Sequence, residues 1–387
     1  MLETSSLTPP AQKNTDVSLF VPNMDGGGAE RVMLQLAQGF AQKGLKVDLV
    51  LARAEGAYLS KVPPEVRLVD LKSKSPVILF KTLALVDYLR QERPKIILSA
   101  LDIVSAATWA KRLAKVPTQV IMSVHTNLSY QFEDKPDLVV GKLRAALVRW
   151  FYPLADGIIA VSRGVADDVA HLANLPPEKV KVIYNPVITP DIGEKAAAPV
   201  DNPWFAPGEP PVILGVGRLV RQKDFATLIR ALAIVRQHTP ARLVILGDVD
   251  KREPAIKPEL KSLITELGLE ESVALPGFVD NPYAYMAKAK VFALSSIYEG
   301  FGNVIAEAMA VGTPVVSTNC KSGPAEILEN GKYGKLSPVG DSQALAEAII
   351  ATLAQPMEPE LLRQRAKAFS VETVVEQYIE VLQIDLK

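Results

Sequence analysis

Several features that define other classes of protein are missing from this sequence of 387 residues. A single cysteine, Cys320, excludes an internal disulfide and favours a reducing compartment. No long uncharged apolar run is present, so we predict no transmembrane helix, and residues 1–16 lack the apolar core of a signal peptide. Lysine plus arginine and aspartate plus glutamate both number 43, so the overall charge does not favour nucleic acid. These absences predict a cytoplasmic protein in which any anion binding is local.

Short apolar runs alternate with helix-length amphipathic segments along the chain. In the first half the apolar runs cover residues 17–21, 47–52, 66–71, 96–100, 120–124, 157–161 and 180–184. After a stretch rich in proline, glycine and alanine at 185–211, the alternation restarts with runs at 212–216, 242–247, 272–275, 291–295 and 314–318. Strands that alternate with helices form parallel sheets covered on both faces. The pattern therefore predicts an α/β fold with two doubly wound, Rossmann-like domains facing each other across a cleft.

The domain boundaries follow from the same pattern. We expect a flexible polar tail at 1–16, a first Rossmann-like domain at 17–190 and a linker at 191–210. A second Rossmann-like domain should cover 211–370, and the last segment, 371–387, has the apolar spacing of a helix.

The stretch 295–314 carries the most informative pattern. Glu299 lies in a glycine-containing loop after a predicted strand, and Glu307 lies in the helix that follows. Asn303 is the predicted N-cap of this helix. The first backbone N–H groups of a helix have no partner within it and bind anions; here they belong to Gly302, Asn303 and Val304. Two carboxylates beside an anion site suit a ligand that carries both phosphate and hydroxyl groups.

Two other loops that follow predicted strands could also contact phosphate. Arg218 and Lys223 can offset the negative charge that develops on a departing diphosphate. Gly27 and Gly28 belong to a glycine-rich loop whose backbone can approach a phosphate closely. That loop departs from the G-x-G-x-x-G dinucleotide fingerprint, because Arg31 occupies the third glycine position.

His125 stands at the carboxyl end of the run 120–124, the edge at which open α/β sheets bind ligands. A lone histidine at such a position is more often a surface or core residue than a functional one. The triplet Asp248-Val249-Asp250 imitates a D-x-D metal motif, but it directly follows the predicted strand at 242–247. We interpret this triplet as a turn and predict no metal site.

Three of these segments together resemble one family of enzymes. They are S-x-x-E-G-F-G-x-x-x-x-E-A-M-A-x-G-T-P-V-V at 296–316, G-R-x-x-x-x-K-D at 217–224 and S-x-H at 123–125. They resemble motifs of the GT-B retaining glycosyltransferases of family 4, also described as glycosyl transferases group 1. The resemblance implies a first domain that binds the acceptor, a second that binds the nucleotide-sugar donor, and a C-terminal helix that crosses back to the first. It also implies metal-independent transfer without a cofactor, because the nucleotide-sugar is a substrate.

The resemblance further implies roles for individual residues. Arg218 and Lys223 would stabilise the departing diphosphate, Glu299 would hold sugar hydroxyls, and Glu307 would hold the ribose. His125 would face the O6 region of the sugar or its reacting side. The residues expected to be catalytic are His125, Glu299, Arg218 and Lys223. The residues expected to bind the donor are Gly27, Gly28, Arg218, Lys223, Val279, Glu299, Phe301, Gly302, Asn303, Val304 and Glu307. The segment 322–328 resembles a variant seen in bacterial polysaccharide enzymes that use UDP-sugars, so a UDP-linked donor is expected.

The resemblance implies transfer of a hexose or N-acetylhexosamine to a hydroxyl acceptor in glycan, polysaccharide or glycolipid synthesis. Residues 142–152 are basic and aromatic, as in a peripheral contact with the inner membrane surface. A helix packed on the sheet with a solvated basic edge explains them equally simply, and we favour that interpretation slightly. Two other functions stay open: a GT-B epimerase or phosphorylase, and a two-domain sugar-binding protein without catalysis.

Overall fold

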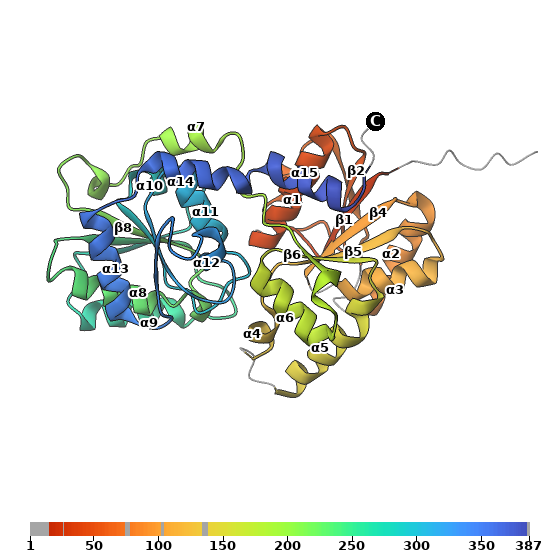
Figure 1. Ribbon diagram of the computed structural model, residues 1–387, viewed down its shortest axis with the longest axis horizontal. Helices are drawn as coiled ribbons and strands as arrows, with labels where there is room; N and C mark the ends of the chain where they lie inside the picture. Colours follow the sequence, from red (N-terminus) through yellow and green to blue (C-terminus); the bar gives the residue numbers. More distant parts are fainter. Residues whose placement is uncertain (1–14, 26, 74–77, 102–103, 134–137, 385–387) are drawn as a thin grey trace, which may run out of the picture. The chain divides into compact units, whose positions relative to one another are not determined.

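The computed structural model describes residues 15–25, 27–73, 78–101, 104–133 and 138–384. The chain divides into two compact units, each of which is considered by itself (Figure 1). The N-terminal unit comprises Met1–Val124, Ala146–Ile159 and Ile384–Lys387, and the C-terminal unit comprises His125–Ala145 and Ala160–Gln383.

The first sheet has seven strands in the order β3-β2-β1-β4-β5-β6-β7, and the β1–β2, β2–β3, β1–β4 and β4–β5 pairs are parallel. Its order reverses between β1 and β4, which is the kind of switch point beside which α/β proteins bind ligands. The strands are β1 (Val17–Val21), β2 (Val47–Leu51), β3 (Val66–Asp70), β4 (Ile96–Ala100), β5 (Gln119–Val124), β6 (Gly157–Ala160) and β7 (Val180–Val182). Ala160 and β7 are counted with the C-terminal unit.

Helices cover both faces of this sheet. One core cluster joins Phe20, Val50 and Ile97 of the strands to α2 (Ile78–Glu92) and α3 (Val104–Ala114). No residue of α1 (Gly28–Gln42) belongs to that cluster, and α1 packs against β1 and β2 from the other face. The remaining helical segments here are η1 (Leu59–Lys61), α5 (Leu138–Phe151), whose first residues belong to the C-terminal unit, and η3 (Tyr152–Leu154).

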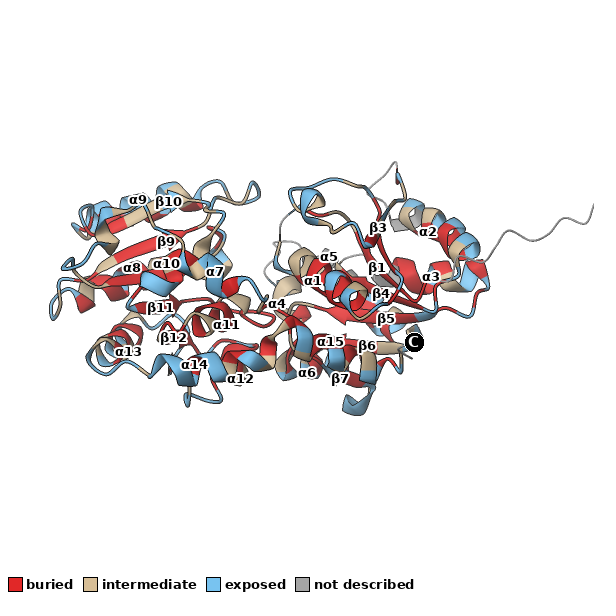
Figure 2. Ribbon diagram, turned by 90° about the horizontal axis from the view of Figure 1, so that it is seen from above, coloured by how far each residue is buried: buried red, intermediate tan, exposed pale blue. Residues whose placement is uncertain are grey.

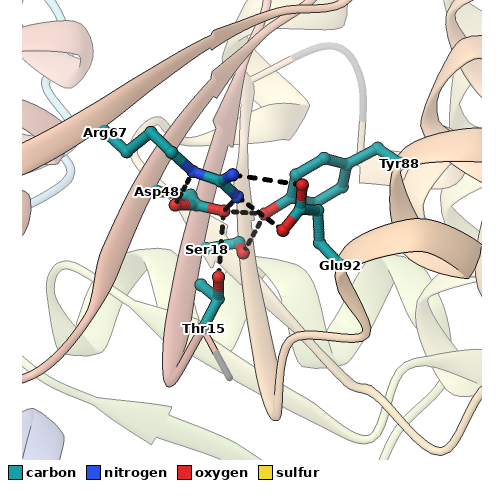
Figure 3. A network of polar contacts seen from close by, with 6 residues as sticks. All are labelled: Thr15, Ser18, Asp48, Arg67, Tyr88 and Glu92. Atoms are coloured by element: carbon teal, nitrogen blue, oxygen red, sulfur yellow. Dashed lines mark hydrogen bonds and ion pairs between the residues drawn. The ribbon is translucent and has the colours of Figure 1, made fainter. Parts of the chain in front are cut away.

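A buried polar network crosses the amino ends of β1, β2 and β3 (Figure 3). Ser18, Asp48 and Arg67 are direct neighbours in the sheet register. Both oxygens of Asp48 are used: Oδ1 accepts from Arg67 Nε over 2.8 Å, and Oδ2 accepts from Tyr88 over 2.6 Å and from Thr15 over 3.2 Å. Burial, together with the Asp48 carboxylate, raises the pKa of Tyr88 and keeps its hydroxyl protonated. The network lies at the sheet edge opposite the one at which ligands bind.

The second sheet has six strands in the order β10-β9-β8-β11-β12-β13, and its paired strands are parallel. The order reverses between β8 and β11, so a switch point lies between them. The strands are β8 (Val212–Val216), β9 (Arg242–Leu246), β10 (Val273–Gly277), β11 (Val291–Leu294), β12 (Val315–Thr318) and β13 (Lys335–Ser337).

Two helical layers enclose the second sheet, as Figures 1 and 2 show. Buried side chains of α8 (Phe225–Val235), α9 (Ile256–Glu266) and α13 (Ser342–Ala354) form one core cluster with the strands. A second layer contains α7 (Ile192–Ala197), α10 (Pro282–Lys288), α11 (Asn303–Ala310) and α14 (Pro359–Ala366). The other helical segments are α4 (Leu128–Glu133), α6 (Arg163–Ala173), η4 (Pro177–Lys179), η5 (Pro203–Phe205), η6 (Arg221–Lys223), α12 (Pro324–Ile327), η7 (Lys367–Phe369) and α15 (Val371–Val381).

The sequence predicted the fold class correctly, since two parallel sheets with alternating helices form two Rossmann-like domains. It missed β13, a strand of three residues whose sequence, Lys-Leu-Ser, has no apolar run. The stretch expected to be a linker contains α7 and η5, and the last helix ends at Val381 rather than continuing to the chain end. Within the described residues, no helix combines the length and apolar character needed to cross a membrane.

Candidate functional site

The carboxyl edge of the second sheet brings three of the predicted segments together. The loop with Arg218 and Lys223 follows β8, the loop with Glu299 follows β11, and Asp250 follows β9. The strand order β9-β8-β11 makes these loops neighbours at the switch point. The predicted site residues of the C-terminal domain therefore converge because of the topology.

An ion pair between Lys223 and Glu299 lies at the centre of this edge. The Lys223 Nζ and Glu299 Oε1 atoms are 2.5 Å apart, and the side chains are 16% and 9% exposed. The Ser296 hydroxyl donates to the same Oε1 atom over 2.7 Å. Glu299 Oε2 has no hydrogen-bond partner among the residues that the structure describes. Glu299 is thus held through one oxygen, and the other is left without a partner among these residues.

The loops that carry this pair are fastened to each other by their backbones. Ile297 donates its N–H to the Gln222 carbonyl over 2.8 Å, and the Gln222 side chain donates to the Tyr298 carbonyl, also over 2.8 Å. Gly217 lies beneath the Lys223 stem, and a Cβ at Gly217 would be 3.2 Å from Lys223 Cε. These contacts hold the ammonium in place before any ligand binds.

The N-cap of helix α11 lies one residue earlier in the chain than the sequence predicted. Gly302, with φ of 94°, is the N-cap, and Asn303 is the first helical residue, so the prediction of an Asn303 cap was wrong. The reason is that Asn303 Oδ1 accepts a hydrogen bond from Asn185 Nδ2 over 2.8 Å and does not cap its own helix. The first backbone N–H groups of α11 still lie at the start of a helix, so the anion site stays a prediction.

Glu307 lies in α11 and is 1% exposed. Its Oε1 atom is 3.5 Å from the Tyr283 hydroxyl of α10. The Glu299 carboxylate contacts the Lys223 ammonium, and one neighbour of the Glu307 carboxylate is a phenol hydroxyl.

Arg218 is paired through NH1 with Asp250 Oδ2 at 2.6 Å, and its side chain is 55% exposed. Arg252 contacts both oxygens of the same carboxylate, at 2.8 and 2.6 Å. The hydrogen bonds from Arg252, followed by the charges of Arg252 and Arg218, hold the pKa of Asp250 well below its usual range. A metal ion at Asp250 would have to displace two guanidinium groups.

His125 directly follows β5 and is counted with the C-terminal unit. A Cβ on Gly300 would lie 2.0 Å from the His125 carbonyl oxygen, so only glycine allows the Glu299 loop to approach this closely. Burial lowers the pKa of His125 to about 4, although a hydrogen bond with the Asn185 side chain acts in the opposite direction. The imidazole is therefore neutral near pH 7.

The remaining predicted residues have different surroundings. The Phe301 side chain is 2% exposed and stacks with Tyr184 and Phe369, so only its backbone is available to a donor. Val279 is partly exposed in the loop after β10, and Val304 is partly exposed in the first turn of α11. Gly27 is the N-cap of α1 and Gly28 its first residue, in the N-terminal unit. Gly26 lies outside the described residues.

Sequence reasoning missed Ser296, Tyr283 and Asn185. Asn185 follows β7 closely, so the rule applied to His125, that polar residues just after strands mark the ligand edge, could have found it. The same rule could have found Ser296, which lies two residues after β11 and opens the S-x-x-E motif. Tyr283 carries no comparable signal, because its contact with Glu307 depends on how α10 and α11 pack.

Two Rossmann-like domains, each a parallel sheet with alternating helices, form the architecture of the GT-B glycosyltransferases. Comparison with known families agrees: the model described as "Glycosyltransferase Family 4" matches residues 26–190, and that described as "Glycosyl transferases group 1" matches residues 200–369. The chain is 31% identical to the Campylobacter jejuni N-acetylgalactosamine-N,N'-diacetylbacillosaminyl-diphospho-undecaprenol 4-alpha-N-acetylgalactosaminyltransferase, over 91% of this chain and 95% of that one. The chain belongs to the GT-B glycosyltransferases of family 4.

Two further similarities extend this result. The Rhizobium meliloti lipopolysaccharide core biosynthesis glycosyltransferase LpsE is 26% identical, over 92% of this chain and 96% of that one. The crystal structure of HepE from Anabaena, in complex with UDP-glucose, matches with a TM-score of 0.77 and 25% identity, covering 95% of this chain and 99% of that one. These matches support glycosyltransferase activity over an epimerase, a phosphorylase or a non-catalytic binding protein.

Proposed function

We propose that the protein is a retaining glycosyltransferase that moves an N-acetylhexosamine or hexose from a UDP-linked donor to a hydroxyl group of a lipid-linked glycan. The observation that carries this proposal is the Lys223–Glu299 pair, in which Glu299 Oε2 is available to a ligand at the carboxyl edge of the sheet. The name of the Campylobacter jejuni relative, with its undecaprenol-linked substrate, supports the acceptor class. The HepE complex with UDP-glucose supports the donor class.

The leaving diphosphate would be stabilised from three directions. Lys223 supplies a fixed ammonium group, Arg218 supplies a more exposed guanidinium, and the first N–H groups of α11 supply aligned dipoles. Because Lys223 already contacts Glu299, binding of the diphosphate would place the ammonium between two anions. These groups act on charge that grows as the sugar–phosphate bond breaks, so they favour the transition state over the ground state.

Transfer with retention needs the acceptor to attack the face from which the diphosphate departs. The acceptor oxygen forms a bond to the anomeric carbon as the bond from that carbon to the phosphate oxygen breaks, and the acceptor proton moves to the phosphate oxygen. Glu299 is tied to Lys223 and Ser296 through Oε1, which suits it to orient sugar hydroxyls. Glu307 would hold the ribose, and the neutral His125 imidazole would face the sugar.

A decisive experiment is transfer from a panel of UDP-, GDP- and ADP-sugars to undecaprenol-diphosphate-linked acceptors, with the anomeric configuration of the product determined by NMR. We expect turnover with a UDP-sugar, an α-linked product from an α-linked donor, and loss of turnover in Glu299→Gln. A product of inverted configuration would overturn the mechanism. Turnover with only GDP- or ADP-sugars would overturn the donor class.

We also propose that a surface of α3, α5 and η3 rests on the cytoplasmic face of an anionic membrane, where a lipid-linked acceptor is presented. Trp109 of α3 and Phe151 of α5 have ring centroids 6.0 Å apart, which connects the two helices. Exposed apolar side chains line this surface: Trp109, Leu113, Leu147, Trp150 and Leu154. Exposed Arg112 and Arg149 lie on the same helices and would pair with anionic head groups.

The sequence had favoured a packed helix with a solvated edge for 142–152. Trp150, at 72% exposure, is placed in solvent, which supports the membrane interpretation. The side chains of Lys142 and Leu143 lie outside the described residues. We expect the Trp109→Ala/Trp150→Ala variant to lose co-sedimentation with phosphatidylglycerol vesicles, whereas Phe278→Ala, which removes an exposed aromatic residue from the C-terminal unit, should not. Equal sedimentation of both variants would refute the surface.

A further inference from the structure

The segment that follows β7 contacts the start of α11 at two places. Tyr184 stacks on Phe301 with ring centroids 5.4 Å apart. The next residue, Asn185, is 5% exposed and donates from Nδ2 to Asn303 Oδ1 over 2.8 Å. The same side chain forms a hydrogen bond with His125. Asn185 therefore lies between the histidine after β5 and the first residue of α11, all within the C-terminal unit.

The two hydrogen bonds determine which amide atom faces each partner. Nδ2 of Asn185 is directed to Asn303, so the oxygen is available to the imidazole. An amide oxygen can only accept a hydrogen bond, so its partner in the bond with His125 is a ring N–H. A neutral imidazole has one N–H donor, so a bond from that N–H to the amide oxygen selects one of the two tautomers.

The backbone of His125 is held by the same loop. The His125 carbonyl lies against Gly300, and the Ser162 hydroxyl donates to the Gly300 carbonyl over 2.7 Å. Gly300 and the Asn185 amide, which contact His125, do not titrate. The neighbouring carboxylate, Glu299, directs Oε1 to Lys223 and Ser296. The ring orientation therefore depends on hydrogen bonds and packing.

We propose that Asn185 is a positioning residue that holds the His125 imidazole and the start of α11 in one fixed arrangement for sugar transfer. The diphosphate and the sugar are parts of one substrate, so the groups that bind them must keep a constant separation. A small misplacement of such groups strongly reduces the rate of a reaction that depends on alignment. The effect on rate rests on the proposed function, whereas the arrangement itself can be measured without a donor.

The first test is the ring nitrogen NMR spectrum of protein labelled with ¹⁵N-histidine. The chain has 3 histidines, and the His125→Gln variant assigns the signal of His125. We expect a single neutral tautomer in the wild type, averaged tautomers in Asn185→Ala, and a ring that protonates at higher pH in Asn185→Asp. The control is Asn127→Ala, which removes another buried amide from the same unit and should leave the His125 signal unchanged. Averaged tautomers in the wild type, or an unchanged spectrum in Asn185→Ala, would overturn the proposal.

The second test measures the rate of transfer. Asn185→Ala should lower kcat by about tenfold, as expected for the loss of a hydrogen bond that aligns a reacting group, and should change UDP affinity much less. Adding His125→Gln to Asn185→Ala should cause little further loss, because the two residues act as one unit. Asn185→Asp, which is nearly the same shape, provides the comparison if the alanine variant folds poorly. If the two substitutions lowered kcat by factors that multiply in the double variant, Asn185 would not act by positioning His125. Absence of turnover in the wild type would instead contradict the proposed function and leave the NMR result to decide on Asn185.

Discussion

Asp48 in the N-terminal unit and Glu299 in the C-terminal unit are both buried carboxylates paired with a cation, but they differ in how their oxygens are used. Both oxygens of Asp48 accept hydrogen bonds, with donors on Arg67, Tyr88 and Thr15. Glu299 accepts its hydrogen bonds from Lys223 and Ser296 through one oxygen alone, among the residues described. A buried charge is costly unless its bonding capacity is filled. Asp48, with both oxygens bonded, is therefore suited to stabilising the fold. Glu299, with one oxygen bonded, is suited to binding a ligand.

The positions of the two sites agree with this distinction. Asp48 lies near the amino end of β2, whereas the loop of Glu299 lies beyond the carboxyl end of β11. Ligands of open α/β sheets bind outside the carboxyl ends of strands. An ion pair alone does not identify a functional site, and the incompletely bonded carboxylate at that edge is the feature that makes Glu299 a candidate.

The largest effect that would test this comparison is loss of stability at Asp48. Asp48→Ala leaves the buried Tyr88 and the Arg67 guanidinium without their acceptor, which should lower the free energy of unfolding by about 3 kcal/mol. Urea denaturation measures this change. The rate of transfer per folded molecule should be unchanged, because the network lies at the edge away from the ligand.

A matched control for Asp48→Ala is Glu360→Gln, which breaks an exposed ion pair with Arg363. This substitution should lower the free energy of unfolding by no more than about 0.5 kcal/mol. The distinction between the two sites would fail if Asp48→Ala kept its stability and lost turnover.

The next effect concerns the cations of the second site. Lys223→Ala and Arg218→Ala should each slow transfer by about two orders of magnitude, since an electrostatic donor to the transition state contributes ~3 kcal/mol. Arg221→Ala is the control, because Arg221 lies in the same loop with its side chain 66% exposed and paired with Glu259. A loss in Arg221→Ala equal to that in Lys223→Ala would show that only general positive charge matters.

The same assay in EDTA tests whether these cations replace a metal ion. We expect activity to persist, because Arg218 and Arg252 already occupy Asp250. Loss of activity with recovery by manganese would instead assign Asp248 and Asp250 as metal ligands.

The sequence predicted that residues just after β8 and β11 lie at one edge of a parallel sheet. It was the family resemblance that grouped Lys223 with Glu299, and the strand order that makes their loops neighbours came from the structure. The pairing between them could not be predicted, because it depends on the η6 turn and on backbone bonds such as that from Ile297 to Gln222.

Other parts of the prediction failed for equally local reasons. Asn303 has the usual chemistry of an N-cap, but a tertiary hydrogen bond from Asn185 occupies its oxygen. The grouping of Phe301 with the donor residues stays a prediction for its backbone alone, because its side chain packs with Tyr184 and Phe369. Tertiary partners decided both cases, and a sequence motif does not specify which side of a loop faces the core. The buried Asp48 network was also missed, because Arg67 and Glu92 carry no pattern that distinguishes them from surface residues.

A smaller effect separates the two glutamates of the second site. If Glu307 holds only the ribose, it binds the donor equally in the ground and transition states, so its loss raises KM and spares kcat. Glu307→Gln should weaken donor and UDP binding by a factor of about 10 to 150, the range for a hydrogen bond to a charged group. Glu299→Gln should lower kcat and leave UDP affinity nearly unchanged. Calorimetry with UDP decides between these roles, and equal losses in both variants would mean that the two carboxylates share one role.

The smallest effect is the pH dependence of stability that His125 contributes. Burial lowers the pKa of His125 to about 4 in the folded protein, whereas an unfolded chain has the ordinary value near 6.5. The unfolded state therefore binds the proton first as the pH falls, and stability is lost from about pH 6.5 down to the folded pKa, with a loss of about 1 kcal/mol between pH 8 and pH 6. Urea midpoints at these two values measure it, and His125→Gln should remove the loss, whereas replacing the exposed His238 should not. If His125→Gln loses the same amount of stability between pH 8 and pH 6, other groups are responsible for that loss. Burial beside the Glu299 loop would then not be what keeps the imidazole neutral.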